Sequence, residues 1–248
     1  MMSIEITSVA DMIHEITKLV KKYNELLWYR GHSVMDWELV PSVQRGNFKN
    51  EKVEQYLVND FFMRASISMK SRPDEYITGW MTLMQHYGLP TRLLDWSASP
   101  LVALFFATND YKKYEYDNGC IWILRPGRLN ELEGFDSYIY PMDKQRVIDM
   151  LRPAFHAHQV NKKVKNKIIA CRPVEYDMRV YTQQSAFTIH NTKRRIEDMK
   201  KSDVLFQLII PASCKKNILM ELKILGITLS NIYPDAEHIA QELKDFYE

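Results

Sequence analysis

The spacing of apolar residues along the chain predicts helices at both ends and several strands between them. Apolar positions at helical spacing predict helices over residues 3–24 (after a strand-like start), 51–70, 76–87, 101–107, 214–225 and 234–248. Continuous apolar runs predict strands over residues 26–30, 119–124 and 204–210, and another that follows a turn within 179–190. Helices and strands do not alternate regularly, so we expect an α+β fold in which N-terminal helices precede a mixed, mainly antiparallel sheet. The length suits a single compact domain over residues 1–248.

Two segments in the second half of the chain give contrasting patterns. Residues 128–149 have no sustained period and are expected to be irregular or weakly helical. The last fifteen residues are amphipathic, and Asp235 is placed to cap their helix. The side chains expected to face inward from this helix are Ile239, Leu243 and Phe246.

Composition excludes several classes of protein. The net charge is only +2, so the overall balance does not require a nucleic-acid partner, and few Gly and Pro argue against long linkers. Three widely spaced cysteines form neither a disulfide framework nor a zinc motif, which indicates reduced thiols and a cytoplasmic location. The first residues lack the pattern of a signal peptide, and no apolar run approaches the length of a membrane span, so we expect no membrane association.

The stretch over residues 83–107 concentrates polar side chains directly before a solid apolar segment. Six of them lie within thirteen positions: Gln85, His86, Thr91, Arg92, Asp95 and Ser97. Gly88 and Pro90 predict a turn after the helix that carries the first two, and Ser97 or Ser99 is placed to cap the next helix. Polar groups held beside a core segment are typical of a functional site. The structural alternative is that Arg92 and Asp95 form a buried pair and His86 is a hydrogen-bonded core histidine.

Arg30 is a second candidate because it lies at the end of the predicted strand 26–30, which Gly31 is expected to terminate. A guanidinium in this position presents a planar set of donors to a phosphate or carboxylate. The structural alternative is an ion pair that closes the first helix.

Residues 150–174 contain no Asp or Glu, although the chain as a whole is almost balanced. The basic residues of this segment are Arg152, Lys162, Lys163, Lys165, Lys167 and Arg172, with His156 and His158. Such a segment is expected either to contact a phosphate-rich partner such as a nucleic acid or to be a solvated face offset by acids elsewhere in the fold.

Several common catalytic motifs are absent from the sequence. There is no Walker A loop, GxGxxG, GxSxG or HExxH motif, and no pair of Cys-x-x-Cys sequences. These absences disfavour a conventional nucleoside triphosphatase, a Rossmann dehydrogenase, a serine hydrolase and a zinc enzyme. We therefore expect no metal.

Three stretches together resemble the FRG domain family. The stretches are Trp28-Tyr29-Arg30-Gly31, Gln85-His86-Tyr87-Gly88-Leu89-Pro90-Thr91-Arg92-Leu93-Leu94-Asp95-Trp96-Ser97, and Gln183 with Phe187-Thr188-Ile189-His190. Gly226-Ile227 and Tyr233-Pro234-Asp235 resemble the usual ending of the family, so the similarity spans about residues 25–240 after an N-terminal helix in residues 1–24. One departure is Ser185, where the family pattern has Gly. The family occurs mostly in bacteria and phages, often among mobile or defence genes, which implies a protein partner within a defence system.

A weaker resemblance links the same features to ADP-ribosyltransferases, which use NAD. There, an Arg at a strand end contacts NAD, a Ser or Thr supports the nicotinamide pocket, and a late Glu steers the ribose. The resemblance assigns Arg30 to the first role, Ser97 or Thr91 to the second, and places Gln183 where the Glu is expected. Gln supplies no negative charge to a ribose that becomes positive as the nicotinamide bond breaks. Another acid would then be needed, and Asp95 is one candidate.

The two resemblances imply a nucleotide site with a catalytic centre. The residues expected at the catalytic centre are Arg30, His86, Asp95 and Gln183. The residues expected to bind NAD or another nucleotide are Arg30, Gly31, Gln85, Tyr87, Thr91, Arg92, Ser97 and Phe187. Other acids of the late segment are Glu175, Asp177 and Glu197.

Three hypotheses about function remain open. The first is an NAD-dependent ADP-ribosyltransferase-like enzyme or NAD glycohydrolase acting as a toxin or antiphage effector. The second is a sensor module that binds a nucleotide or nucleic acid without chemistry. The third, ranked well behind the others, is a nuclease or hydrolase that uses His86 and Asp95 as acid and base.

Overall fold

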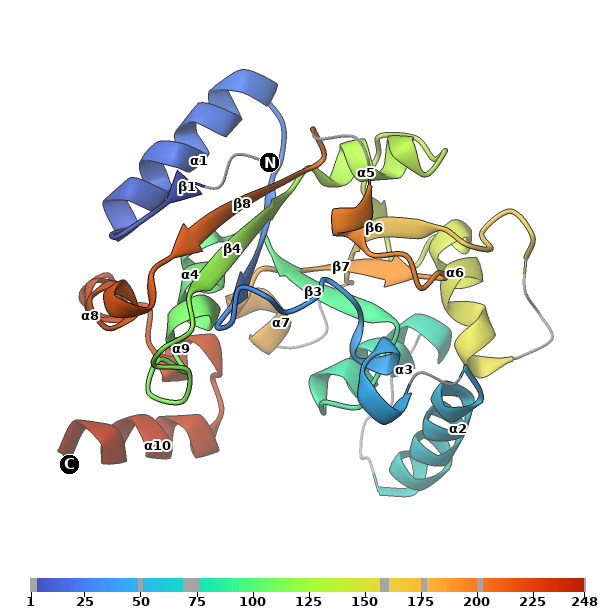
Figure 1. Cartoon of the computed structure of the whole chain (residues 1–248). Coiled ribbons are helices and arrows are strands. Elements are labelled where there is room, and N and C mark those ends of the chain that lie inside the picture. Colours follow the sequence, from blue (N-terminus) through green and yellow to red (C-terminus); the bar gives the residue numbers. More distant parts are fainter. Residues whose placement is uncertain are drawn as a thin grey trace.

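The computed structural model describes residues 4–48, 51–68, 76–156, 161–174, 178–199 and 203–247, and every structural statement below refers to these residues. Their strands form one eight-stranded sheet in the order β1-β8-β4-β2-β3-β7-β6-β5 (Figure 1). The strands are β1 (Ile4–Glu5), β2 (Trp28–His32), β3 (Leu93–Ser97), β4 (Gly119–Leu124), β5 (Tyr140–Pro141), β6 (Ile168–Arg172), β7 (Ser185–His190) and β8 (Leu205–Ile210). Only β1–β8 and β5–β6 are parallel pairs, which confirms the predicted mixed, mainly antiparallel sheet of an α+β fold.

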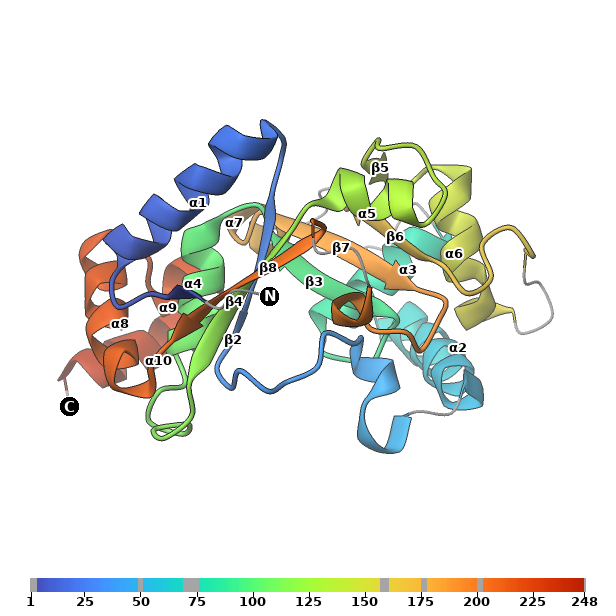
Figure 2. The same cartoon turned by 45° about the horizontal axis from the view of Figure 1, so that its top comes forward.

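Helices pack on the sheet as two groups, one near each end of the strand order. The α-helices are α1 (Val9–Tyr23), α2 (Glu51–Ser68), α3 (Tyr76–His86), α4 (Pro100–Thr108), α5 (Pro126–Leu132), α6 (Gln145–Phe155), α7 (Met178–Thr182), α8 (Lys215–Ile224), α9 (Leu229–Ile232) and α10 (Ala236–Tyr247). Short 3₁₀ turns are η1 (Ser42–Gln44), η2 (Gly46–Phe48), η3 (Ile196–Asp198) and η4 (Ala212–Cys214). Figures 1 and 2 show α1, α4 and α8 beside β4 and β8, α3 and α6 near β7 and β6, and α2 packed on α3 and α6.

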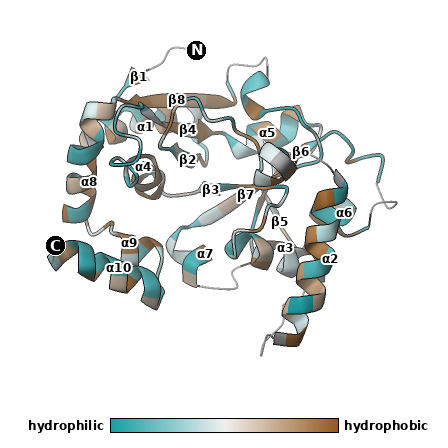
Figure 3. Ribbon diagram, turned by 60° about the horizontal axis from the view of Figure 1, so that its bottom comes forward, coloured by the Kyte–Doolittle hydropathy of each residue, from teal (hydrophilic) through white to brown (hydrophobic). Residues whose placement is uncertain are grey.

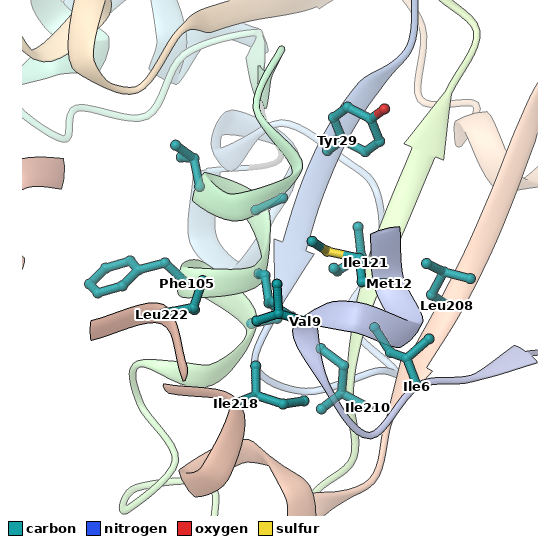
Figure 4. Packing of buried hydrophobic residues seen from close by; sticks show 14 of the residues in the cluster. Ile6, Val9, Met12, Tyr29, Phe105, Ile121, Leu208, Ile210, Ile218 and Leu222 are labelled. Carbon is teal, nitrogen blue, oxygen red and sulfur yellow. The ribbon is translucent and has the colours of Figure 1, made fainter. Parts of the chain in front are cut away.

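The first helix group encloses a core built from distant parts of the chain. Figure 4 shows Val9 and Met12 of α1 lying against Ile121 of β4 and Leu208 of β8. Each of these side chains is almost completely withdrawn from water, and burial of one such side chain contributes roughly 1.5–3 kcal/mol. A second core lies under α2, α3 and α6, and a third, rich in tryptophan, lies on the opposite face of the sheet. Figure 3 shows β8 in brown, whereas α10 alternates between hydrophilic and hydrophobic residues.

The ladder between β2 and β3 is much shorter than the ladder on the other side of β2. All five residues of β2 pair with β4, from Trp28 opposite Leu124 to His32 opposite Cys120. The only pair between β2 and β3 is Tyr29 with Ser97. The two strands in the middle of the sheet are therefore joined at one end only.

The predicted strand at residues 26–30 begins later than expected and continues through Gly31. Gly31 does not terminate β2 but lies inside the strand. A glycine is needed at this position because α4 passes directly over it. A Cβ atom built on Gly31 would lie 1.9 Å from the carbonyl oxygen of Ala103 and 2.7 Å from the amide nitrogen of Ala107. Only a residue without a side chain allows the helix to approach this closely.

Other predictions of local structure were wrong in instructive ways. The segment predicted to be irregular or weakly helical, residues 128–149, contains the end of α5 and the start of α6, but also the unpredicted strand β5. The strands β3 and β6 were not predicted. Polar residues within β3 and basic residues around β6 obscured the apolar pattern of each strand. The helix α10 is present and the amide of His238 donates to Asp235, as a cap requires. However, Ile239, Leu243 and Phe246 are all exposed rather than inward.

Among the described helices, none combines the length and the apolar composition that a membrane crossing requires.

We predict that Gly31→Ala destabilises the protein by about 3 kcal/mol, because the added methyl group must displace the backbone of α4. Denaturant unfolding followed by circular dichroism measures this change. Gly119→Ala is the matched control, since its Cβ would meet its nearest neighbours at 3.0–3.2 Å and is expected to cost only about 1 kcal/mol. Equal costs for the two variants would contradict the proposed contact between α4 and β2.

Candidate functional site

A cavity of about 290 Å³ opens where β2 and β3 diverge. Its walls come from β2, β3, α4, α7 and the segment after α9. The residues that line it are Tyr29, Arg30, Gly31, Ser33, Trp37, Gln85, Asp95, Trp96, Ser97, Val102, Ala103, Phe106, Asp110, Arg179, Gln183, Ser185 and Tyr233. The cavity thus brings together six predicted site residues from three separate stretches of the sequence.

Arg30 lies between the two diverging strands. Its Nη1 donates to the backbone carbonyl of Asp95 at 2.6 Å, and its Nε donates to Nε2 of His32 at 3.1 Å. The Asp95 carboxylate is 3.8 Å from Nη1, so the ion pair is loose. Burial lowers the pKa of Arg30 to about 10, although the charge of Asp95 opposes this shift. At neutral pH Arg30 is therefore still a cation, and only 17% of its side chain is exposed.

A chain of hydrogen bonds fixes the orientation of Asp95. Gln85 Nε2 donates to Oδ2 of Asp95 at 2.8 Å, and the hydroxyl of Thr91 donates to the other side-chain atom of Gln85, Oε1. Thr91 in turn accepts from the amide of Leu93 at 3.1 Å and is fully buried. The Asp95 side chain itself is 52% exposed, so an oriented carboxylate faces the cavity.

Ser97 and Gln183 connect β3 to the turn after α7. The Ser97 hydroxyl donates to the backbone carbonyl of Gln183 at 2.7 Å and accepts from the amide of Ser99, the residue that caps α4. Gln183 Nε2 donates to the carbonyl of Ile232 at 3.2 Å. The next residue, Gln184, has a φ of 46°, which places the tight turn there rather than at Ser185.

Arg179 and Tyr233 also line the larger cavity. The guanidinium of Arg179 lies over the ring of Tyr233 at 4.6 Å and donates to the carbonyl of His86 at 3.0 Å. The ring of Tyr233 is also stacked with that of His238, 4.3 Å away, and His238 binds the carboxylate of Asp235. These contacts hold a second cation at the cavity.

A smaller cavity of about 40 Å³ adjoins the first. Its lining residues are Thr82, Gln85, His86, Asp95, Arg179, Val180, Gln183, Ser185 and Phe187. Five of these, including Asp95 and Gln183, also line the larger cavity. His86 and Phe187, both predicted site residues, are therefore placed at the smaller cavity rather than at the larger one.

Three other expected binding residues are not at either cavity. Arg92 is turned away from Asp95 and forms a buried, two-pronged ion pair with Glu54 of α2, at 2.9 and 2.5 Å. Tyr87 is 61% exposed and lines neither cavity. Thr91 does not line either cavity, but its hydroxyl donates to Gln85, which does. The alternative of a buried pair between Arg92 and Asp95 is therefore not found, because the partner of Arg92 is Glu54.

The late acids do not add a carboxylate to the cavity within the described residues. Glu197 is engaged by the amide of Leu39 at 2.9 Å on a different part of the molecule. Glu175 and Asp177 lie outside the described residues. Among the described side chains, no group of three or more His, Cys, Asp or Glu could hold a metal ion.

The basic segment 150–174 holds the end of α6 and the strand β6, which lies near the β5 edge of the sheet, whereas the cavity lies at the middle of the sheet between β2 and β3. Two of its charges have local partners: Arg152 lies 3.8 Å from Asp149, and Lys167 donates to the carbonyl of Glu133. Its exposed charges are Lys162, Lys163, Lys165 and Arg172. Residues 157–160, which include His158, lie outside the described residues.

Arg179, Trp37 and Asp110 were not identified as site residues from the sequence. Trp37 and Asp110 follow β2 and α4 closely in the sequence, whereas Arg179 reaches the cavity from a distant part of the chain. Tyr233 could have been identified from the sequence, because it belongs to the Tyr-Pro-Asp sequence that resembles the usual ending of the FRG family.

Fold and cavity define an α+β domain with a charged ligand-sized cavity at a break in its central sheet. The family model of the FRG domain matches residues 25–116, which contain the first two of the three stretches that resemble the family, whereas the third stretch and the ending lie outside the match. No curated protein and no solved structure matches the chain. The matched part supplies β2, β3 and α4, whereas Arg179, Gln183 and Tyr233 come from beyond it.

We predict that Glu54→Ala lowers the free energy of unfolding by about 3–5 kcal/mol, because Arg92 would be left as an uncompensated buried charge. The measurement is urea unfolding. Asp60→Ala on the same helix is the matched control: the exposed Asp60 lies 3.9 Å from Arg64, and its loss is expected to cost at most about 0.5 kcal/mol. A similar small effect for Glu54→Ala would contradict a structural role for Arg92.

Two buried histidines make stability depend on pH. Desolvation, followed by the nearby cation Arg30 for His32 and by Arg194 for His190, lowers the pKa of each to about 3. The unfolded chain, with histidine pKa values of about 6.5, then binds more protons below that pH. Stability is thus full above pH 6.5 and is lost as the pH falls towards 3, by about 2 kcal/mol per histidine at pH 5.

We predict that the difference in unfolding free energy between pH 7 and pH 5 becomes smaller, by up to about 2 kcal/mol, in His190→Gln. Urea unfolding at both pH values measures it, and His14→Gln on the exposed face of α1 is the control that should leave the difference unchanged. The same pH dependence in wild type and His190→Gln would show that His190 is not held neutral by burial.

Proposed function

We propose that the cavity between β2 and β3 binds NAD and that the protein cleaves its nicotinamide–ribose bond, as an ADP-ribosyltransferase-like enzyme or NAD glycohydrolase. The observation that carries the proposal is the meeting of a largely buried cation, Arg30, with an oriented and exposed carboxylate, Asp95, in one cavity. The first suits the anionic part of a dinucleotide, and the second suits the positive charge that develops on the ribose.

The charges and size of the cavity support binding of part of a dinucleotide. Arg30 and Arg179 supply donors for the diphosphate from two different walls, and Trp37 offers an exposed aromatic ring at the rim. A volume of about 290 Å³ lies at the lower limit of ligand pockets, which typically enclose about 300–1,000 Å³. The cavity therefore suits the nicotinamide riboside half, with the adenosine half lying outside.

Asp95 is the residue best placed to assist the chemistry. As the glycosidic bond breaks, its electron pair moves to the pyridinium nitrogen and positive charge builds on the ribose. A carboxylate held by Gln85 stabilises that charge without having to reorganise. Gln183 donates one Nε2 hydrogen to the carbonyl of Ile232, and its Oε1 is the atom that would accept from a ribose hydroxyl. In this arrangement two residues take over the role of the absent Glu. Gln183 orients the ribose, and Asp95 supplies the negative charge.

The role as a toxin or antiphage effector rests on the FRG resemblance alone. A domain of this family that consumes NAD inside a bacterium would deplete the cell of NAD or attach ADP-ribose to a target. Its activity would need control by a partner from the same defence system.

We predict that Asp95→Asn lowers the rate of nicotinamide release by about 10²–10³-fold while NAD affinity changes little, because the charge that assists bond cleavage is removed. Arg30→Lys is expected to weaken NAD binding at least about tenfold, since an ammonium cannot replace a planar guanidinium that already bonds two partners. Calorimetric titration measures affinity, and chromatography of released nicotinamide measures the rate.

Asp143→Asn, an exposed acid next to Lys144 and remote from the cavity, is the matched control and should behave as wild type. NAD binding that does not depend on Arg30, or release that does not depend on Asp95, would contradict the proposal. Binding without any release by the wild type would favour the alternative, a sensor that recognises a nucleotide with Gln183 in place of a catalytic acid.

A further inference from the structure

Trp37 presents an exposed indole ring to the larger cavity, and two other rings hold it from the side. It is 42% exposed, whereas Trp96, the other tryptophan of the cavity lining, is 3% exposed. The rings of His32 and Tyr114 contact the indole at 5.9 and 5.3 Å, with interplanar angles of 61° and 89°. Neither neighbour lies parallel to the indole, so a further flat ring can still stack on it.

A buried lysine fixes the two segments that carry these rings. Lys215 is completely buried, and its Nζ donates to the carbonyl of Ser33 at 2.7 Å and to the carbonyl of Tyr114 at 3.1 Å. It thereby holds residues 33–37 against residues 109–118, and we call these two segments the aromatic corner. Because the corner is ordered by contacts of the protein itself, a ligand that stacks there has little ordering cost to offset.

The aromatic corner begins one side chain away from the cation that is proposed to hold the diphosphate. Nε of Arg30 donates to Nε2 of His32 at 3.1 Å, and the imidazole of His32 contacts the indole of Trp37. A phosphate bound by Arg30 and a ring stacked on Trp37 would thus lie on either side of one imidazole. Phosphate and base are neighbours in the same way in a nucleotide, where one ribose separates them.

The aromatic corner also carries an acid that no described residue neutralises. Asp110 lines the larger cavity, and its backbone carbonyl accepts from the amide of Tyr114 at 3.1 Å. Its exposed carboxylate forms no hydrogen bond or ion pair within the described part of the chain. A carboxylate only accepts hydrogen bonds, so it suits the hydroxyl groups of a ribose and disfavours an additional phosphate.

We infer that the adenine of NAD stacks on Trp37 and that its ribose donates to Asp110, so that the aromatic corner selects NAD over NADP. The inference rests on the proposed function for the identity of the ligand. In NADP a phosphate replaces the 2′-hydroxyl of this ribose, and an acid that accepts from the hydroxyl repels the phosphate.

Calorimetric titration with NAD and with nicotinamide mononucleotide, which lacks the adenosine half, separates the aromatic corner from the rest of the site. Trp37→Leu is expected to weaken NAD binding about tenfold or more, because base stacking is lost, and to leave the binding of nicotinamide mononucleotide unchanged. Trp37→Phe keeps a ring and is expected to retain most of the NAD affinity. Tyr116→Leu, an exposed ring of the same corner that lines neither cavity, is the matched control.

The selection of NAD over NADP is measured by the same titrations. The wild-type protein is expected to bind NADP at least about tenfold more weakly than NAD, since the 2′-phosphate meets the carboxylate of Asp110. Asp110→Asn is expected to reduce this difference. Glu115→Gln, which neutralises an exposed acid of the same corner, is the matched control and should leave the difference unchanged.

The results distinguish this inference from the function on which it rests. Loss of affinity for NAD alone in Trp37→Leu supports the inference, whether or not the bound NAD is cleaved. Unchanged NAD affinity in that variant, or an equal loss for NAD and nicotinamide mononucleotide, overturns it. Equal binding of NAD and NADP by the wild type also overturns it but leaves the proposed function intact. Failure of the wild type to bind either NAD or nicotinamide mononucleotide contradicts the proposed function, and the inference with it.

Discussion

The hydrogen bond from Arg30 to the carbonyl of Asp95 replaces the ladder that β2 and β3 would otherwise form. Their register at Tyr29 and Ser97, if continued, would place Gly31 opposite Asp95, yet no further pair exists. The guanidinium instead satisfies the Asp95 carbonyl at 2.6 Å and remains buried and charged. A buried cation without partners and a strand edge without pairing are both unfavourable. Here the guanidinium donates to the unpaired carbonyl, so the contact offsets both costs.

This break in the sheet determines where the site can be. On one side Gly31 lets α4 lie directly on β2, and residues of both elements line the cavity. On the other side the hydrogen bonds from Thr91 through Gln85 to Asp95 prevent the carboxylate from closing onto Arg30, and their ion pair stays at 3.8 Å. Opposite charges that are held apart in a cavity are available to a ligand, whereas a tight pair is not.

The sequence predicted the composition of the site better than its geometry. Gln85, Asp95 and Ser97 are close together along the chain, so their clustering was visible. Arg30 was found from the end of its predicted strand, and the family motifs added Gln183. Arg92 belongs to the same cluster but points elsewhere, because its partner Glu54 lies 38 residues away and only the packing of α2 brings it near. The fold shows the same limit. Long periodic helices were found, but short strands such as β6 depend on pairing that a local pattern cannot reveal.

The central claim is that a nucleotide binds where β2 and β3 diverge, and not on the basic segment 150–174. Hydrogen–deuterium exchange with and without NAD tests it most directly, because the amides of both regions are followed in one experiment. The account predicts slower exchange on addition of NAD in peptides covering residues 28–37, 93–99 and 179–185, with no change in the basic segment. Unchanged exchange in all three peptides, or protection confined to residues 161–174, would contradict it.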